Sequence, residues 1–388
     1  MSKDKVDIYF VCIGGYDMPY SRVRGYHFAQ ILQSHGIKTK VLSFQDHLER
    51  RHNGAEMLGL LDHKRLWLNL QAFSRLRKHH RSLFYIQKVH YHAAAPFLLS
   101  RLGRNKYVLD YDDWDLDRSP LFQFPLLNQL WFGATGTERI TRRIAREAVG
   151  CVAASKPLAE FLLEENRNTV YLPTGVNTKR FCRKTKESDG KTVFLWTGQI
   201  WGKVIFDNLV FLLECFKRVL HAHVDAQFRI VGRGEWLDPL KERIRGELPT
   251  GTWEIIEWVH PDDMPRVLNE ASVGLLPLIP DEQNWEWMMS KSPTKLFEYM
   301  ACGLPSIAMP HGDAAKVLRH GKDGYLAESV EEFSEAMITL SKDRRLRQRM
   351  GQSARQHVEI NYSLDALGKR LAKWLDGILS GQNATMGA

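Results

Sequence analysis

Apolar and polar residues alternate along the chain in blocks that fit buried strands followed by amphipathic helices. An apolar run at residues 6–13 ends in Gly14-Gly15, and residues 24–35 then place apolar side chains on one side of a helix. Short apolar runs bounded by turn residues are typical of strands with both faces covered. In the first half of the chain we predict strands at residues 6–13, 39–44, 83–87, 107–111, 150–154 and 170–172.

A polar stretch without apolar periodicity, residues 183–191, interrupts this pattern, and we predict a linker there. After it the alternation of strands and helices starts again. We predict strands at 192–197, 227–231, 254–258, 273–276 and 306–309. We predict helices at about 207–221, 237–247, 264–270, 293–302, 330–342 and 364–379, followed by a frayed tail at 380–388.

This order of elements indicates an α/β fold with two Rossmann-like, doubly wound domains. We predict an N-terminal domain at residues 1–183 and a C-terminal domain at 191–363, with the helix at about 364–380 packing back on the first domain. Ligands bind such sheets at the carboxyl ends of the strands. We therefore expect the two domains to face each other across a cleft that holds the site.

Length and composition are those of an ordinary globular protein. A chain of 388 residues with 44% hydrophobic content can bury a core without disulfides or a structural metal. The five cysteines are scattered and show no paired spacing, so we expect reduced thiols in a cytoplasmic compartment. The N-terminus has no signal-peptide pattern, and we expect no membrane-spanning segment.

The positive charge is concentrated in the first half of the chain. Residues 1–175 hold 25 Lys and Arg against 17 Asp and Glu, and residues 63–109 hold ten Lys and Arg and no acid. Such a distribution favours an anionic partner. Because residues 66–84 mix these charges with aromatic and aliphatic side chains, we expect peripheral contact with an anionic membrane.

A second stretch, residues 119–132, is rich in Leu and Phe and precedes Arg139, Arg142, Arg143 and Arg146. The alternative for the first stretch is a helix packed inward by Trp67, Leu70 and Phe73 with a solvated basic face. No nucleic-acid-binding motif is present, and we expect no nucleic-acid partner.

The predicted helix at 293–302 is the strongest candidate for chemistry. Ser292 suits its N-cap, Pro293 suits the first helical position and Gly303 suits the residue after the last turn. Unpaired N–H groups at the start of a helix bind anions. Glu298 lies about 7 Å further along the helix axis, about the span from a diphosphate to its ribose. Alternatively, the helix is an ordinary buried connection in which Glu298 pairs with an Arg or Lys.

The run SPTKLFEYMACGLPSIA resembles the nucleotide-sugar signature of family 4 retaining glycosyltransferases, which have the GT-B fold. Nearly the whole chain takes part in the resemblance. The other segments that carry it are IYFVCIGGYDMPYSRVRGYHFAQILQSHGIKTKVLSF, CVAASKPLAEFL, YLPTGVNTKRF, VFLWTGQIWGKVIFDNLVFLLECF, FRIVGRGE, WVHPDDMPRVLNEASVGLLPL and HGKDGYLAES.

The resemblance implies roles for several residues toward a nucleotide-sugar donor. Glu298 would hold the ribose hydroxyls, and the helix start would bind the diphosphate. Lys203 would neutralise the diphosphate. The residues implied at the helix start are Thr294, Lys295 and Leu296; those implied in the first glycine turn, which lets the backbone approach the phosphate, are Gly14 and Gly15. Gly232, in the loop under the base, Val259 and Ser292 complete the binding residues that we predict.

The chain departs from the family pattern at three places. Ser290 stands where a glutamate normally contacts the donor sugar, and Gln199 stands where an arginine is usual. Lys316 ends a segment where the family often has Gly-Gly-x-x-Glu. We still include Ser290 and Gln199 among the substrate-binding residues.

Five aspartates at or just after the predicted strand 107–111 form a second candidate group: Asp110, Asp112, Asp113, Asp115 and Asp117. We expect Asp112 or Asp113 to face the cleft and to orient the acceptor hydroxyl or stabilise positive charge developing on the sugar. A metal site and simple loop capping are the alternatives.

Two further pairs of residues are candidates for a chemical role. His90 and His92 are candidate ligands or acid–base groups, with His92 taken as substrate-binding, or they simply line a loop. Arg22 and Arg24 open a predicted helix, where two cations are unfavourable unless an anion is near. We predict that both contact a phosphate, with a surface role as the alternative.

The resemblance implies an enzyme that moves a hexose from a nucleotide-diphosphate sugar to an acceptor hydroxyl with retention of configuration. It implies no cofactor and no metal. We expect a glycan or lipid-linked acceptor, a role in polysaccharide or glycolipid assembly, and a place in the cytoplasm at the inner face of the plasma membrane. The alternatives are a nucleotide-sugar epimerase of the same fold and a non-catalytic protein that binds sugar nucleotides.

Overall fold

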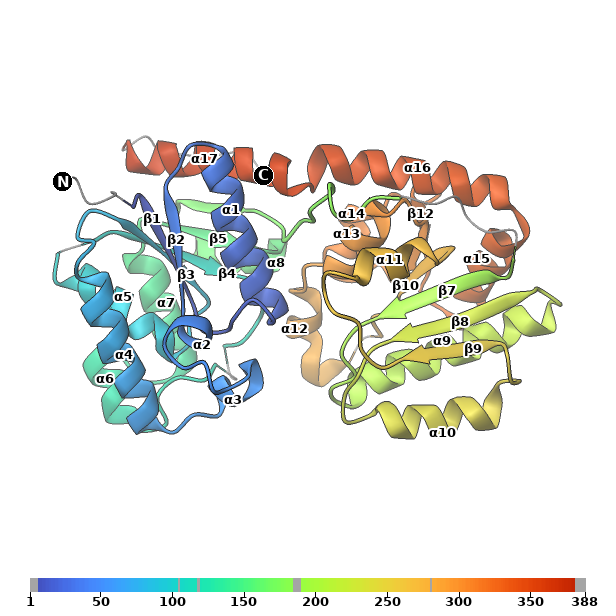
Figure 1. Cartoon of the computed structure of the whole chain (residues 1–388), viewed down its shortest axis with the longest axis horizontal. Helices are drawn as coiled ribbons and strands as arrows, with labels where there is room; N and C mark the ends of the chain where they lie inside the picture. The colour runs from blue at the N-terminus through green and yellow to red at the C-terminus, as the bar shows by residue number, and fades with distance from the viewer. Residues whose placement is uncertain (1–5, 104, 117–118, 184–189, 280, 381–388) are drawn as a thin grey trace. The chain divides into compact units, whose positions relative to one another are not determined.

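The computed structural model describes residues 6–103, 105–116, 119–183, 190–279 and 281–380. Most of the predicted linker, Asp117 and most of the predicted tail lie outside these residues. The chain forms two compact units (Figure 1). Unit 1 is drawn from residues 1–174, 290–292 and 364–388, and unit 2 from residues 175–289 and 293–363.

Unit 1 is built on a six-stranded sheet in the order β2-β1-β3-β4-β5-β6, and all its strand pairs are parallel. The central strands β1, β3 and β4 are mostly apolar because helices cover both faces of the sheet, with Gln87 and Asp110 as buried polar exceptions. The strands are β1 Ile8–Cys12, β2 Thr39–Ser43, β3 Leu83–Gln87, β4 Tyr107–Tyr111, β5 Gly150–Ala153 and β6 Thr169–Tyr171.

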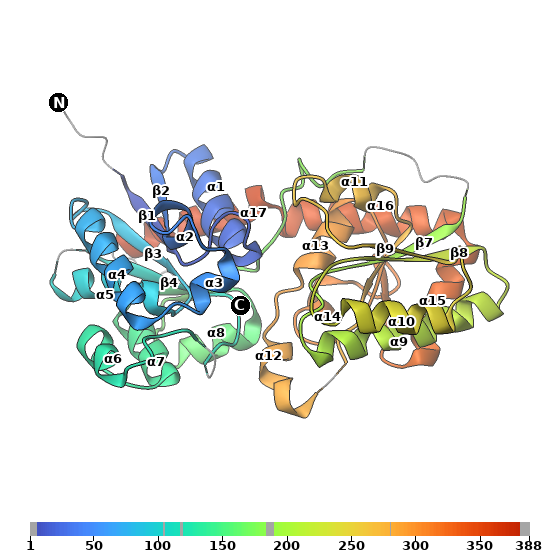
Figure 2. The same cartoon turned by 60° about the horizontal axis from the view of Figure 1, so that its bottom comes forward.

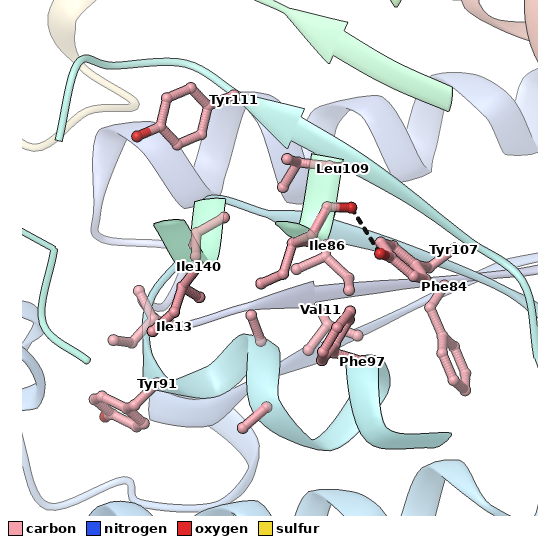
Figure 3. Close-up of a cluster of buried hydrophobic side chains, with 14 of the residues drawn as sticks. Val11, Ile13, Phe84, Ile86, Tyr91, Phe97, Tyr107, Leu109, Tyr111 and Ile140 are labelled. Carbon is pink, nitrogen blue, oxygen red and sulfur yellow. Dashed lines mark hydrogen bonds between the residues drawn. The ribbon is translucent and has the colours of Figure 1, made fainter. Parts of the chain in front are cut away.

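Two apolar layers hold the helices of unit 1 to its sheet. α1 and α17 cover one face, where Phe28 and Trp374 are buried against Phe10 and Tyr85. The other face packs against α4, α5 and α7, and Figure 3 shows Phe97 and Ile140 of this second cluster. The helices are η1 Ser21–His27, α1 Phe28–Ser34, α2 Phe44–His47, α3 Gly54–Leu58, α4 Asp62–Leu76, η2 Tyr91–Ala93, α5 Ala94–Arg101, α6 Pro125–Phe132, α7 Thr137–Glu147, α8 Lys156–Leu163 and α17 Leu364–Leu379.

Unit 2 has a second six-stranded parallel sheet, in the order β12-β11-β10-β7-β8-β9. Its strands are β7 Thr192–Thr197, β8 Ala226–Val231, β9 Trp253–Ile256, β10 Val273–Leu276, β11 Ser306–Ala308 and β12 Gly324–Leu326. In Figure 2, α9, α10 and α15 lie along one side of this sheet and α11 and α16 along the other. The helices are α9 Lys203–His221, α10 Leu237–Glu247, α11 Met264–Asn269, η3 Glu282–Asn284, α12 Trp285–Met289, α13 Thr294–Ala301, α14 Ala314–Val317, α15 Val330–Lys342 and α16 Arg344–Asn361.

The predicted fold class of two doubly wound α/β units is confirmed. The last helix, α17, is grouped with unit 1 and contacts α1. Residues 175–183, expected at the end of the N-terminal domain, are grouped with unit 2, where Val176 and Phe181 join a core cluster. Among the described residues, no helix combines the length and the apolar character needed to cross a bilayer.

Candidate functional site

Helix α13 begins one residue later than predicted, and its start differs from the prediction. Pro293 is the N-cap residue, and no side chain caps the helix. The prediction of Ser292 as the cap is wrong, because the Ser292 hydroxyl oxygen accepts a hydrogen bond from the Thr174 N–H at 3.2 Å. The first turn of α13 therefore lacks the side-chain acceptor that commonly satisfies N–H groups at a helix start.

Lys295 lies in that first turn against the end of β7. Its Nζ is 4.6 Å from the centre of the ring of Trp196, which is buried. A Cβ atom on Gly198, just after β7, would lie 2.6 Å from Lys295 Nζ. Because Gly198 has no side chain, the Lys295 ammonium group has room to lie beside the start of α13.

Glu298 lies one turn after Thr294, about 6 Å along the helix axis. It is partly exposed, whereas its neighbours Phe297 and Tyr299 are fully buried. The Tyr299 hydroxyl accepts a hydrogen bond from the Thr197 N–H at 3.0 Å and lies 3.1 Å from the Thr197 hydroxyl. This contact fixes α13 to the carboxyl end of β7 and leaves Glu298 off the buried face.

The loops after β7, β8 and β9 lie against one another. The Gly198 N–H donates to the Val231 carbonyl at 2.9 Å, and the Gly232 N–H donates to the Ile256 carbonyl at 2.9 Å. A Cβ atom on Gly232 would lie only 2.0 Å from the Gly198 carbonyl oxygen, so the close approach requires glycine. Gln199, Gly232 and Val259 therefore all follow the carboxyl ends of neighbouring strands.

Lys203 begins α9 after the first of these loops. Its Nζ lies 2.6 Å from Asp207 Oδ2, one turn further along the helix, and its side chain is 70% exposed. An exposed ion pair of this kind contributes little stability. The lysine is therefore open to a second anionic partner.

In unit 1, side chains from α2 already occupy the glycine turn after β1. The Gly15 N–H donates to Gln45 Oε1 at 2.8 Å, and the Tyr16 N–H donates to Asp46 Oδ2 at 3.0 Å. A Cβ atom on Gly15 would lie 2.1 Å from Asp46 Oδ1. Gly14 and Gly15 form the predicted close turn, but the anionic group held there is the chain's own carboxylate.

The two arginines predicted to contact phosphate differ in their surroundings. Arg22 Nη1 donates to the carbonyls of Tyr16 and Asp17, each at 3.2 Å, and so braces the glycine turn. Arg24 is fully buried, with Nε 2.8 Å from Asp110 Oδ1. The prediction of a phosphate contact by Arg24 is wrong for this structure, because its guanidinium group is inside unit 1.

In this buried ion pair with Arg24, Asp110 also accepts a hydrogen bond and has a shifted pKa. The Tyr85 hydroxyl donates to its carboxylate. Burial raises the pKa of Asp110 to about 6, against the opposing effect of Arg24. Asp110 is thus the partner of the buried arginine inside unit 1.

The aspartates after β4 gather around Lys88, a residue that the sequence analysis did not single out. Lys88 Nζ lies 3.1 Å from Asp115 Oδ2, 3.5 Å from Asp112 Oδ1 and 3.9 Å from Asp113 Oδ2. Lys291 Nζ lies 3.8 Å from Asp113 Oδ2. The only signal in the sequence was a lysine placed directly after an apolar strand.

Burial and charge act in opposite directions on these carboxyl groups. Burial raises the pKa of Asp112, although Lys88 opposes the change. Burial would also raise the pKa of Asp115, but Lys88 and His90 outweigh it and hold that pKa below its usual value. Among the described residues, no group of three or more His, Cys, Asp or Glu side chains is arranged to hold a metal ion.

The two histidines after β3 are buried. His92 Nε2 lies 2.9 Å from the Gln87 carbonyl oxygen, and burial places the pKa of His92 well below its usual value. His90 Nε2 lies 3.1 Å from Asp115 Oδ2. The prediction of His92 as a substrate-binding residue does not agree with its complete burial. Ser290 is also fully buried, and its hydroxyl has no hydrogen-bond partner among the described residues.

Comparison with known proteins shows a family match for the part of the chain that holds α13 and Lys203. Residues 191–343 match the model of the family "Glycosyl transferases group 1". The chain contains a glycosyl transferases group 1 domain. This domain spans β7 through α15 and includes Lys203, Gly232, Lys295 and Glu298.

Two curated relatives and one solved structure illustrate the similarity. Spore coat protein SA of Bacillus subtilis is 23% identical over 215 residues, 52% of this chain and 54% of the relative. A GDP-mannose-dependent monoacylated alpha-(1-6)-phosphatidylinositol monomannoside mannosyltransferase of Corynebacterium glutamicum is 26% identical over 219 residues, 53% of this chain and 55% of the relative. The chain thus spans about half the length of the curated relatives that it matches.

The solved structure of Anabaena HepE in complex with UDP has a TM-score of 0.65 and 14% identity, and the match covers 96% of this chain and 100% of that one. At this identity the similarity concerns the fold. The predicted GT-B fold, with two Rossmann-like units, is confirmed.

Proposed function

We propose that the protein is a retaining glycosyltransferase that moves a hexose from a nucleotide-diphosphate sugar to an acceptor hydroxyl. One observation carries the proposal: the glycosyl transferases group 1 domain contains a helix whose uncapped start has Lys295 beside it and Glu298 one turn later. The separation suits a diphosphate at the helix start and a ribose diol at the carboxylate.

In the proposed reaction the acceptor oxygen forms a bond to the anomeric carbon while the bond from that carbon to the diphosphate oxygen breaks. The electron pair of the broken bond goes to the diphosphate. The acceptor proton passes to a phosphate oxygen of the leaving group, so no separate protein base is required. Lys203, Lys295 and the N–H groups of α13 stabilise the departing negative charge, and this electrostatic effect provides most of the catalysis.

The test is an assay of sugar transfer and of donor consumption with purified protein. We expect Glu298→Gln to weaken donor use strongly, because a carboxamide is a poorer acceptor for two hydroxyl hydrogen bonds. We expect Lys203→Met to lower kcat more than it raises the donor KM. The control is Glu335→Gln, an exposed carboxylate on α15, which should leave both constants unchanged.

The two alternative functions give different results in the same assay. An epimerase would convert the free donor without any acceptor. A non-catalytic binding protein would bind the donor and release neither nucleotide nor sugar. Either result with wild-type protein would overturn the proposed transfer.

Two relatives point to different donor bases. HepE is described in complex with UDP, and the relative from Corynebacterium glutamicum is GDP-mannose-dependent. A thermal-shift screen with UDP, GDP, ADP and CMP sugars would separate the bases. We expect one nucleoside diphosphate to raise Tm most, since a bound ligand stabilises the folded state.

We also propose that the acceptor is a glycan or lipid-linked sugar and that unit 1 meets an anionic bilayer at the cytoplasmic face. Apolar side chains on α4 and just before and along α6 are 48% exposed or more, and we name them the α4–α6 surface: Trp67, Leu70, Phe124, Leu126 and Leu130. The Asp62 carboxylate at the start of α4 accepts hydrogen bonds from the Gln123 and Phe124 N–H groups at 2.8 and 2.7 Å, which ties the two helices together. Contrary to the alternative considered from the sequence, Trp67 and Leu70 do not pack inward, whereas Phe73 does pack against the core.

Exposed positive charge on this side of unit 1 comes mainly from α4 and the residues just after it, with Arg139 also exposed on α7. Arg75 and Lys78, at and just after the end of α4, are exposed. In contrast, Arg142, Arg143 and Arg146 on α7 pair with Glu138, Glu147 and Glu165. The attraction to anionic lipid therefore rests on α4 and its C-terminal turn.

Vesicle flotation tests the membrane contact. Vesicles of phosphatidylcholine with phosphatidylglycerol should carry the protein up the gradient, and pure phosphatidylcholine vesicles should carry less. The double variant Trp67→Ser/Leu70→Ser should float less than wild type. Trp285→Ser, which removes an exposed tryptophan from unit 2, is the control. Equal flotation of both variants would contradict the proposed contact.

A further inference from the structure

Lys88 has an unusual backbone conformation. Its φ angle is +66°, and it is one of two non-glycine residues with positive φ among those described. A left-handed conformation is unfavourable for residues with a Cβ atom and persists where the surroundings enforce it. The Lys88 N–H donates to the Asp110 carbonyl at 2.8 Å, so this conformation turns the chain at the end of β3 while the pairing with β4 continues.

The turn delivers a lysine side chain into a nearly closed environment. The Lys88 side chain is 7% exposed, and its three aspartate partners follow the carboxyl end of β4. Its Nζ also lies 5.2 Å from the centre of the Tyr20 ring. The aspartates differ in exposure: Asp112 is 9% exposed and Asp113 is 27% exposed.

We propose that Lys88 is a positioning residue whose ammonium group holds the carboxylates of Asp112 and Asp113 together at the end of β4 and, through them, orients the acceptor hydroxyl. The orientation of the acceptor hydroxyl by the carboxylates rests on the proposed function. The effect of Lys88 on the carboxylates does not depend on that function, and it can be measured without turnover.

Mutual repulsion of the carboxylates makes the lysine necessary. Like charges a few ångströms apart in a poorly solvated place favour protonation or separation of the groups, and a cation between them reverses both effects. Lys88 lies within 4 Å of all three aspartates, and Lys291 adds a second cation near Asp113. The other titratable groups that interact electrostatically with Asp112 include Cys12, Tyr20, Arg24, Tyr85, His90, Asp110, Asp113, Asp115 and Lys291.

The kinetic test compares Lys88→Met, which keeps the length of the side chain, with Lys88→Arg, which keeps the charge. We expect Lys88→Met to lower kcat by about 100-fold, the loss typical of a misplaced catalytic group, with little change in the donor KM. The acid limb of the kcat–pH profile should move to higher pH in Lys88→Met. In Lys88→Arg, both kcat and the pH profile should lie close to those of wild type. Lys217→Met, which removes a lysine lying 2.5 and 3.0 Å from two glutamates of unit 2, is the matched control.

A readout without turnover keeps the inference separate from the proposed function. With carboxyl-labelled aspartate, NMR titration should show higher pKa values for Asp112 and Asp115 in Lys88→Met than in wild type, and no change in Lys217→Met. Wild-type protein that transfers no sugar would overturn the proposed function, and the titration would still decide what Lys88 does to the carboxylates.

Three results would overturn the inference itself. One is an unchanged titration of the aspartates in Lys88→Met. Another is a changed titration of the aspartates in Lys88→Met together with a kcat equal to that of wild type. The third is a loss of kcat that follows a lower Tm, leaves the pH profile unmoved and is not restored by Lys88→Arg. If Lys88→Met does not fold, Lys88→Gln, which keeps a hydrogen-bond donor without the charge, takes its place with the same expected results.

Discussion

The ammonium nitrogen of Lys295 lies 4.6 Å from the centre of the Trp196 ring, so β7 fixes a cation beside the first turn of α13. A cation over an indole face is stabilised by the ring while its charge remains available to an anion. In the proposed function this charge meets the donor diphosphate.

We therefore expect Lys295→Met to weaken the binding of a nucleoside diphosphate by about 10- to 100-fold, the range for losing one charge-assisted hydrogen bond. Isothermal titration calorimetry with UDP or GDP measures the change. The parent nucleoside, which lacks phosphates, should bind wild type and variant equally. An equal loss for nucleoside and nucleotide would show that the variant had disturbed the pocket as a whole.

Gly232→Ala should destabilise unit 2 and weaken nucleotide binding, because the new methyl group would lie 2.0 Å from the Gly198 carbonyl oxygen. The loops after β7 and β8 would have to separate. Gly246→Ala is the matched control, since this glycine lies within α10 and a methyl group there meets nothing within 4 Å. We expect that control to raise the free energy of unfolding by about 0.5–1 kcal/mol through helix propensity. Chemical denaturation and calorimetry check both variants.

Tyr299→Phe should lower the free energy of unfolding by about 1–3 kcal/mol, because it leaves the buried Thr197 N–H without its acceptor. Thr197→Val removes only the threonine hydroxyl and keeps the N–H bonded to Tyr299, so its effect should be smaller. Urea denaturation followed by tryptophan fluorescence compares the two. A larger loss for Thr197→Val would mean that the hydroxyl contact, and not the amide contact, fixes α13 to β7.

The buried Asp110 should make stability depend on pH in a defined direction. Its pKa in the folded protein is raised to about 6 by burial, above the ordinary value of about 3.9 in an unfolded chain. Between these values the folded state binds the proton more tightly, so this group lowers the free energy of unfolding as the pH rises.

Asp110→Asn removes that contribution. We expect wild type to lose up to about 1.4 kcal/mol more per pH unit than Asp110→Asn between about pH 4 and pH 6. Urea denaturation across this interval gives the slope of the free energy of unfolding against pH for each protein. The slopes are compared, and not the absolute stabilities, because the variant also weakens the pair with Arg24. Parallel slopes would contradict the assignment.

Most of the fold could be predicted from periodicity, because parallel strands with both faces covered are apolar throughout. β3, β4, β7 and β10 have the predicted bounds. Two of the elements that the pattern missed have little apolar signal: β12 has three residues, and α16 is rich in Arg and Gln. Several apolar helices of unit 1, such as α5 and α8, were also left without bounds. Helix α13 was found to within a residue at each end, yet its cap was misassigned, because the Ser292 hydroxyl is used by Thr174.

Site residues were harder to predict than elements, since burial is decided by contacts distant in sequence. Arg24 and His92 are polar residues next to predicted turns, and only the three-dimensional packing shows that Asp110 and the Gln87 carbonyl take them into the interior. Lys88 was missed because its place directly after an apolar strand is a weak signal, and its partners are aspartates more than twenty residues later in the chain.

The packing of α17 against unit 1 affects the order in which the two units are completed during translation. Leu367, Leu371 and Trp374 complete the cluster that covers Phe10 and Val108. During translation the ribosome must synthesise the whole of unit 2 before these residues emerge. One side of the first sheet is therefore covered by α1 but not yet by α17 until the end of synthesis, whereas all of unit 2 has been made before α17 emerges.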